Sequence, residues 1–233
     1  MKNHSFSAHH SVLALGLFAA IGVGLAMAIL AVAQYPAFFL HPGARVYLFE
    51  PIGALVVYAV AIVLVARAHG QCWDAVLKTA IPFGLLTGIF EVLNIGIENG
   101  IPFRAAGPGV AIGFMIVVFT LWGAAGFRAA RSLGSVGPGL LAAVSSGCIC
   151  MLIAVAAGFV VQFFVAPPDP AVISIWAEYK RSGWTDARAF GIANTLESAF
   201  THLVVAPLVA TVVGGLGTLL VRFKRSNAIS IAH

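Results

Sequence analysis

Six long apolar stretches, separated by short polar segments, run through the sequence. A helix needs about 20 consecutive apolar residues to cross the hydrocarbon core of a bilayer, and each stretch is near or above that length. We therefore predict an all-α, polytopic membrane helical bundle of about six transmembrane helices, forming a single domain over residues 1–233. The predicted spans are residues 12–33, 46–66, 79–97, 110–127, 140–166 and 189–221.

Two of the predicted spans carry polar side chains at helical spacing. In the last span they fall within an arc of about 140°, and in the third span within about 60°. The residues of these two polar stripes are Asn194, Glu197, Ser198, Thr201 and His202 in the last span, and Glu91, Asn94 and Glu98 in the third. We predict that the stripes face each other inside the bundle and form a polar pocket. Its candidate binding residues are Glu91, Asn94, Asn194, Glu197, Thr201 and His202.

The composition supports a membrane environment and argues against nucleic-acid binding. Hydrophobic residues make up 61% of the chain and charged residues 9%, whereas a soluble domain has about 25% charged residues. The formal charge of +5 fits an orientation signal and contact with lipid headgroups. No basic run is interleaved with aromatic residues, so we expect no nucleic-acid partner.

Charge asymmetry predicts the orientation. Six spans place both termini on one side, and that side carries eight of the 13 Lys and Arg residues against five on the other. The positive-inside rule then predicts a cell inner membrane protein with both termini in the cytoplasm. We expect residues 12–33 to be retained as the first span, because a signal peptide has a shorter apolar core of about 7–15 residues. Cleavage after Ala33 stays an alternative.

This orientation gathers the polar groups in the outer half of the bilayer. Glu91 lies about 9 Å from the outer end of its span, and Glu197 and His202 lie about 12 and 20 Å from the outer end of theirs. Gln34, Glu50 and Gln162 are also at outer ends. The polar insertion at residues 171–188 predicts a short interfacial helix on the same side. Its aromatic residues, Trp176, Tyr179 and Trp184, are a candidate lid over an outward-facing pocket. We expect a Gly/Pro-rich loop at residues 98–109.

The length of the last span leaves a competing interpretation. Residues 189–221 would measure about 50 Å as one helix, and residues 203–221 alone are nearly long enough to cross the membrane. Glu197 and His202 would then lie above the bilayer. Glu91 has no such alternative, because its span has no length to spare and an acid at that depth is costly unless it is paired or hydrated.

The candidate pocket is compatible with several kinds of chemistry. Two neighbouring carboxylates in a medium of low dielectric can share a proton near neutral pH, as proton-coupled transport requires. The same acids, with Asn94 and Asn194, offer oxygen ligands for a hard cation. We expect neither a bound metal nor a cofactor, because His202 is the one histidine within a predicted span and the side chains of Cys148 and Cys150 point about 160° apart on a helix.

The last third of the chain has a recognisable order of features. An apolar helix is followed by a Pro-Asp pair, a Glu-Tyr pair, a polar turn led by glycine, and a final helix with Thr-Leu-Glu and proline. These features are Pro168-Asp169, Glu178-Tyr179, Gly183-Trp184-Thr185, Thr195-Leu196-Glu197 and Pro207. The pattern resembles a family of bacterial integral membrane proteins that is defined by a domain of unknown function. The resemblance implies no activity.

The sequence favours one function among three. The leading hypothesis is proton- or cation-linked transport of a small solute through the outward-facing pocket, with Glu91 and Glu197 as titratable groups. The second is a non-catalytic membrane subunit or assembly protein whose polar stripes bind helices together. The third and least favoured is a membrane enzyme that acts on a lipid-like substrate through Glu197 and His202.

Overall fold

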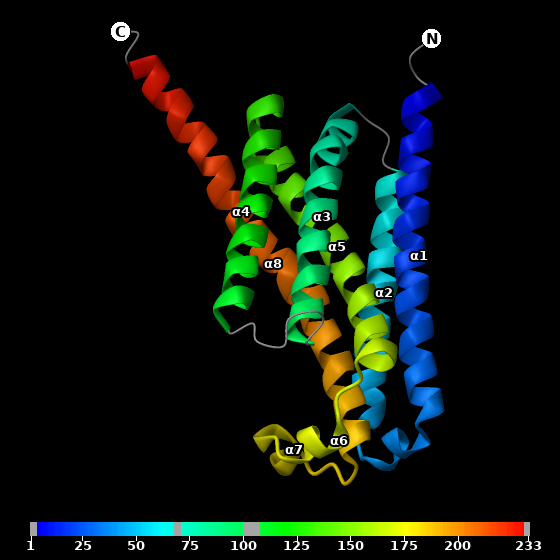
Figure 1. Ribbon diagram of the computed structural model, residues 1–233. Helices are drawn as coiled ribbons and strands as arrows, with labels where there is room; N and C mark the ends of the chain where they lie inside the picture. The colour runs from blue at the N-terminus through cyan, green and yellow to red at the C-terminus, as the bar shows by residue number, and fades with distance from the viewer. Residues whose placement is uncertain (1–3, 68–70, 100–107, 231–233) are drawn as a thin grey trace. The chain divides into compact units, whose positions relative to one another are not determined.

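The computed structural model describes residues 4–67, 71–99 and 108–230, and those residues form helices and short connections without a strand (Figure 1). Six of the helices are long. They are α1 (His4–Gln34), α2 (Ala44–Arg67), α3 (Gln71–Glu98), α4 (Pro108–Leu133), α5 (Val136–Val160) and α8 (Ala187–Ser230). The predicted all-α bundle is therefore confirmed. Of the predicted loop at residues 98–109, Glu98 still belongs to α3, and Pro108 and Gly109 already belong to α4. Residues 100–107 lie outside the described part of the chain.

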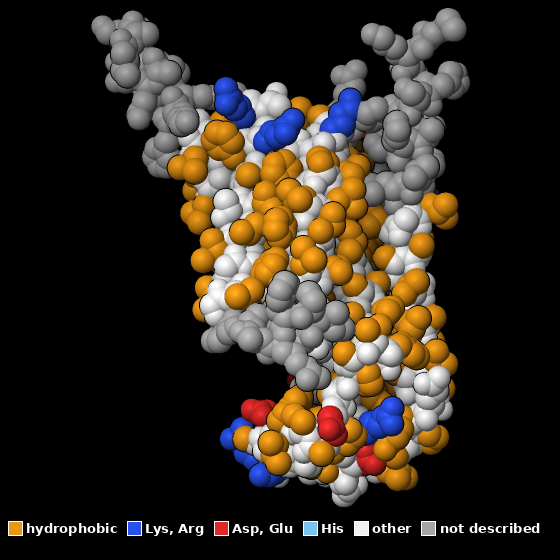
Figure 2. Space-filling model, in the orientation of Figure 1, with side chains coloured by type: hydrophobic (Ala, Val, Ile, Leu, Met, Phe, Trp, Pro, Cys, Tyr) orange, Lys and Arg blue, Asp and Glu red, His pale blue; other side chains and the backbone are white. Residues whose placement is uncertain are grey.

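Each long helix contains a segment that is apolar and long enough to cross a membrane. These segments are Ala14–Gln34, Ala44–Val65, Cys72–Glu98, Gly109–Leu133, Val136–Val165 and Ala187–Arg222. Large apolar side chains cover the sides of the helices, and the Lys and Arg side chains visible in Figure 2 lie at helix ends. On α8, for example, Leu208, Val212 and Leu216 are exposed one turn apart. Such a surface is stable in lipid, so the chain is a multi-pass membrane protein.

The chain divides into two compact units. Unit 1 contains residues 1–63 and 155–204, and unit 2 contains residues 64–154 and 205–233. Unit 1 thus holds α1, most of α2, the segment between α5 and α8, and the first part of α8. Unit 2 holds α3, α4, most of α5 and the rest of α8. A single membrane domain stays a prediction from the sequence.

Small residues bring the helices of unit 2 close together. Gly84 and Gly88 on α3 lie against Ile149 and Ile153 on α5, where a Cβ at either glycine would stand less than 3 Å from the isoleucine side chain. A Gly-x-x-x-Gly spacing favours this kind of close helix packing in membrane proteins. A line of glycines, the glycine seam, also lets α4 and α5 pack closely against α8. The glycine seam consists of Gly123, Gly126, Gly139, Gly214 and Gly217.

In unit 1, a side chain from α2 satisfies the backbone of α8. Pro207 lies inside α8 and has no N–H to offer the carbonyl oxygen of Leu203, four residues earlier. The hydroxyl of Tyr58 donates a 2.7 Å hydrogen bond to that oxygen. Leu203 is buried, and the bilayer core offers no water as a substitute partner. α8 therefore continues through the proline from Ala187 to Ser230.

The insertion between α5 and α8 differs in detail from the prediction. Residues 171–188 were expected to contain one short helix, but two are present, α6 (Pro170–Ser174) and α7 (Ala177–Ser182). The backbone of Trp176 is extended, with φ −63° and ψ 139°, and this conformation separates the two helices. Gly183 ends α7 in the left-handed conformation, with φ 77°, which glycine adopts without steric cost.

Candidate functional site

The polar stripe of α3 lies in unit 2 and surrounds a half-buried acid. The amide nitrogen Nδ2 of Asn94 donates to Oε1 of Glu98 over 3.1 Å. Oδ1 of Asn94 is buried and has no hydrogen-bond partner among the described residues. Glu91, one turn before Asn94, is half-buried. The stripe therefore places a carboxyl group next to a buried amide oxygen with unused bonding capacity.

The next polar groups near Glu91 are a hydroxyl one turn earlier on α3 and a thiol from α5. Thr87 is fully buried and donates to the carbonyl oxygens of Phe83 and Gly84, at 2.8 and 3.2 Å. The thiol of Cys150 on α5 interacts with the Thr87 hydroxyl and with the Glu91 carboxyl group. Cys150 itself is fully buried.

The polar stripe of α8 lies in unit 1 on an exposed face. Asn194, Glu197, Thr201 and His202 are all exposed, and no described residue hydrogen-bonds the Glu197 carboxyl group. Nδ1 of His202 lies 2.7 Å from the carbonyl oxygen of Ser198. Because a carbonyl oxygen can only accept, Nδ1 is the donor in this contact.

The two stripes thus belong to different compact units, Glu91 to unit 2 and Glu197 to unit 1. That they face each other stays a prediction, and so does the binding role of their residues. The geometry within each unit is defined. In unit 2 the groups are half-buried or buried, apart from Glu98 at the end of α3, and in unit 1 they are exposed.

A pocket with a volume of about 310 Å³ lies within unit 1. Its polar lining comes from the ends of three spans. These lining residues are Gln34 and Tyr35 at the end of α1, Gln162 after α5, and Arg188 and Thr195 in the first part of α8. Apolar walls come from Ala31, Phe163, Ile173 and Ile192. The pocket therefore combines convergent polar groups with apolar walls, as ligand sites commonly do.

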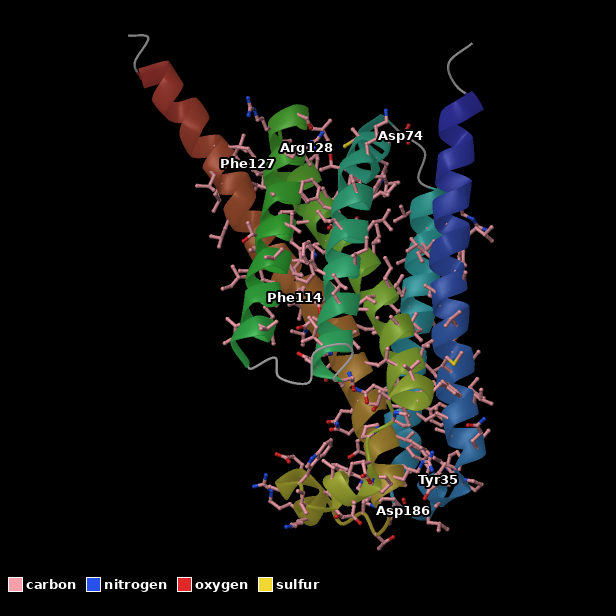
Figure 3. The ribbon with its side chains drawn as sticks, in the orientation of Figure 1. Tyr35, Asp74, Phe114, Phe127, Arg128 and Asp186 are labelled. Carbon is pink, nitrogen blue, oxygen red and sulfur yellow. The ribbon has the colours of Figure 1, made fainter. Side chains whose placement is uncertain are left out.

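Asp186 joins α1 to α8 beside the pocket. The Tyr35 hydroxyl donates to Oδ2 of Asp186 over 2.9 Å, and the backbone N–H of Ala189 donates to Oδ1 over 2.8 Å. Figure 3 shows Tyr35 at the end of α1 and Asp186 before α8, close together. The hydrogen bond to Asp186, followed by burial and the charge of Asp186, raises the pKa of Tyr35 above its ordinary value. The phenol is therefore held in its protonated, donating form.

The guanidinium of Arg188 lies over the ring of Tyr35, with its Cζ 5.5 Å from the ring centroid. A cation over an aromatic face is attracted by the ring quadrupole. Because the hydrogen bond to Asp186 fixes Tyr35, this stack holds Arg188 at the pocket. α8 thus presents a cation within its first turn, at a position set by α1.

Two backbone features shape the pocket wall, one in the segment after α5 and one in α8. Val161–Val165 form a π-helical turn after α5, and this turn carries Gln162 and Phe163 into the pocket lining. Single π turns are frequent at functional sites because they redirect side chains. On α8, Gly191 allows Ile173 of α6 to approach, since a Cβ at Gly191 would stand 2.7 Å from Cδ1 of Ile173.

The candidate lid residues lie elsewhere in unit 1. Trp184 is buried and stacks on His41, with ring centroids 4.0 Å apart and planes 12° apart. Trp176 and Tyr179 are half-buried. None of the three lines the pocket, whereas Pro168 and Ile173 of the same connection do. A lid role for the three aromatic residues stays a prediction.

Most of the pocket lining was not predicted as a site from the sequence. Gln34 and Gln162 were recognised only as polar residues at outer ends, and Arg188 and Thr195 were not singled out. The sequence signal for these residues is their position at the ends of the predicted spans. Gln34, Gln162 and Arg188 are polar residues at the same predicted side of three different spans, and helix ends on one side of a bundle can converge.

Comparison with known proteins does not narrow the function, since no protein-family model, curated protein or solved structure matches the chain. The resemblance of the last third to a family of unknown function therefore stays an expectation. Within the described residues, no group of three or more His, Cys, Asp and Glu side chains is placed to hold a metal ion.

Proposed function

We propose that this protein binds a small solute in the pocket of unit 1 and moves it across the cell inner membrane. The observation that carries the proposal is the pocket itself, which has about 310 Å³ of space, apolar walls and five polar side chains from three span ends. Apolar packing alone can hold a membrane bundle together without polar side chains from three spans converging on one pocket. Convergent polar groups in an apolar cavity favour a ligand site.

The predicted topology supports an outward opening. With both termini in the cytoplasm, the first span ends at Gln34 on the outer side, and the span that ends at Val165 does so too. Ala187 begins the last span on that same side. The pocket would then be the first binding site that an external solute meets.

The volume limits the size of the solute. A water molecule occupies about 30 Å³ in the liquid, so the pocket has room for roughly ten waters. Ligand pockets in proteins range from about 300 to 1,000 Å³. The solute is therefore small, on the order of ten non-hydrogen atoms.

Glu91 is the proposed coupling group. It is half-buried within a span, next to Asn94, whose Oδ1 lacks a partner among the described residues. A carboxyl group in this position can exchange a proton or bind a cation during transport. Glu197 on α8 is the second proposed titratable group, in keeping with the predicted facing of the two stripes.

The exposed stripe of α8 favours a second candidate function, that of a membrane subunit or assembly protein. The Glu197 carboxyl group and the Asn194 amide have no partner among the described residues, and both are exposed on a helix that is long and apolar enough to cross the membrane. Polar side chains on such a face form hydrogen bonds with a neighbouring helix. A partner protein would supply that helix.

Uptake into proteoliposomes separates these functions. Purified protein is reconstituted and tested with a panel of radiolabelled small solutes of different charge, with empty liposomes as the blank. Thr195→Leu fills the pocket, and Thr211→Leu is its matched control. Both threonines donate to the carbonyl oxygen four residues earlier in α8, but Thr211 does not line the pocket.

The proposal predicts that wild type and Thr211→Leu take up at least one solute of the panel and that Thr195→Leu does not. Equal uptake by both variants would place the transport route elsewhere. No uptake above the blank by any form would favour the subunit function instead.

A further inference from the structure

The pocket of unit 1 carries a positive charge that no lining residue neutralises. Among the described residues that line it, Arg188 is the one lysine or arginine, and none is Asp or Glu. In the described part of the chain, no ion pair joins Arg188 to a carboxylate. By contrast, Arg181 on α7, outside the pocket, has its guanidinium 3.9 Å from Glu178.

Asp186, the acid nearest to Arg188 in the sequence, does not line the pocket and forms no ion pair with Arg188 among the described residues. Its two carboxylate oxygens accept the hydrogen bonds from the Tyr35 hydroxyl and the Ala189 N–H. Asp186 thus orients Tyr35 and caps α8, while the guanidinium keeps its hydrogen-bond donors. The contact with the Tyr35 ring is not a hydrogen bond, and Arg188 donates none to another described residue, so its N–H groups remain available to a carboxylate or phosphate.

The rest of the lining is neutral and mostly apolar. The side-chain amides of Gln34 and Gln162 can donate or accept. The Thr195 hydroxyl donates to the carbonyl oxygen of Gly191, so its oxygen can only accept. Phe163, Ile173 and Ile192 give the ligand no polar contact. A ligand complementary to this lining has one anionic group and a short apolar part.

We infer that the pocket of unit 1 takes a small amphiphilic anion, a carboxylate or phosphate ester with a short hydrocarbon group, whose charge pairs with Arg188. The inference rests on the proposed solute-binding function and names its ligand class. It differs from the cation considered from the sequence, because the acids that favoured a cation do not line this pocket. Since the pocket lies at span ends, the anionic group can come from a lipid headgroup or from a free organic anion.

Charge-selective thiol labelling tests the inference whichever anion is the ligand. Cys72, Cys148 and Cys150 are replaced by alanine, and Thr195→Cys places a thiol in the pocket lining. The protein, in phosphatidylcholine nanodiscs at low salt, reacts with two methanethiosulfonates of similar size, one carrying a sulfonate and the other a trimethylammonium group. Because the same thiolate reacts with both reagents, its own pKa cancels in the ratio of the two rates.

Arg188 and residue 195 are seven residues apart on α8, a rise of roughly 10 Å. A single positive charge at that distance in nearly aqueous surroundings should favour the anionic reagent by roughly fourfold. Adding Arg188→Gln should bring the ratio close to one, and Arg181→Gln, the matched control, should leave it unchanged. Retained reaction of the Arg188→Gln form with a neutral methanethiosulfonate shows that the pocket is still formed.

Two experiments, each testing whether a candidate ligand protects the thiol from labelling, identify the source of the anion. If a free anion is the ligand, pentanoate slows labelling by a neutral reagent in phosphatidylcholine discs, while pentanol and pentylamine at equal concentration do not. If a lipid headgroup is the ligand, replacing part of the phosphatidylcholine with phosphatidylglycerol slows the labelling instead. Either pattern, lost in Arg188→Gln, supports the inference.

A rate ratio near one, or a ratio that Arg188→Gln leaves unchanged, would overturn the inference. So would the failure of both pentanoate and phosphatidylglycerol to protect the thiol. These results leave the proposed function standing if uptake of a solute still depends on Thr195. If no reagent labels Thr195→Cys at all, the pocket is closed, and both the inference and the proposed function fail.

Discussion

The hydroxyl of Tyr58 on α2 donates a 2.7 Å hydrogen bond to the carbonyl oxygen of Leu203 on α8, the oxygen that Pro207 leaves without a helical partner. An unsatisfied buried carbonyl costs about 1–3 kcal/mol. We expect Tyr58→Phe to lower the free energy of unfolding, measured in detergent micelles, by that amount. In a Pro207→Ala background the same change should cost much less, because the alanine N–H then bonds Leu203.

This double-mutant cycle isolates the hydrogen bond from the general effect of removing a hydroxyl. Equal losses of stability in the two backgrounds would show that Tyr58 acts through some other contact.

The glycine seam of unit 2 makes a second prediction. A Cβ at Gly217 on α8 would overlap the carbonyl oxygen of Gly123 on α4. Backbone cannot move aside as a flexible side chain can, so Gly217→Ala should destabilise the protein by about 1–3 kcal/mol. Gly113→Ala on α4 is the control, since nothing lies within 4 Å of its added Cβ. A thermal unfolding comparison of the two variants checks this, and a stable Gly217→Ala protein would contradict the close approach of α4 and α8.

Tyr35 gives a prediction in the alkaline range. Its pKa in the folded protein is raised above the ordinary value of 10.0, first by the hydrogen bond to Asp186 and then by burial. A group whose pKa rises on folding contributes stability that is complete below the unfolded pKa and is lost as the pH rises through the folded pKa. The tie between α1 and α8 should therefore hold up to about pH 10 and weaken above it.

The ultraviolet difference titration of tyrosinate measures this directly. Subtracting the Tyr35→Phe curve from the wild-type curve isolates Tyr35, and its midpoint should lie above the ordinary pKa of 10.0. Asp186→Asn should bring the midpoint back toward the ordinary value. A wild-type midpoint at or below the ordinary value would show that Tyr35 does not donate to Asp186.

Glu91 is expected to govern the pH dependence of transport. If its carboxyl group exchanges a proton during the cycle, Glu91→Gln should flatten the dependence of uptake rate on pH while the protein remains folded. Glu98→Gln is the control, because Glu98 lies on the same stripe but is exposed at the end of α3. The same pH profile in wild type and Glu91→Gln would remove Glu91 from the coupling mechanism.

The features that depend on a run of residues could be predicted from the sequence, because membrane insertion is decided by the length and polarity of each segment. The six spans follow from this rule. The close packing of α3 on α5 also follows from a local signal, the spacing of Gly84 and Gly88. In both cases the information lies within one helix.

The pocket could not be predicted in this way, because its residues come from the ends of three helices that are far apart in the chain. Gln162 lines it through a π-helical turn, which depends on packing and leaves no pattern in the sequence. Similarly, the sequence shows Pro207 but does not say which side chain satisfies Leu203. The break between α6 and α7 occurs at Trp176, without the glycine or proline that usually marks one.

The central claim is that the pocket of unit 1 opens to the outer side of the membrane, and the sidedness of thiol labelling tests it most directly. Thr195→Cys and Arg128→Cys, each in the cysteine-free background, are exposed to a membrane-impermeant maleimide in intact spheroplasts and again after lysis. The account predicts that Thr195→Cys reacts before lysis and that Arg128→Cys, at the predicted cytoplasmic end of α4, reacts only afterwards. Labelling of Thr195→Cys only after lysis would contradict it.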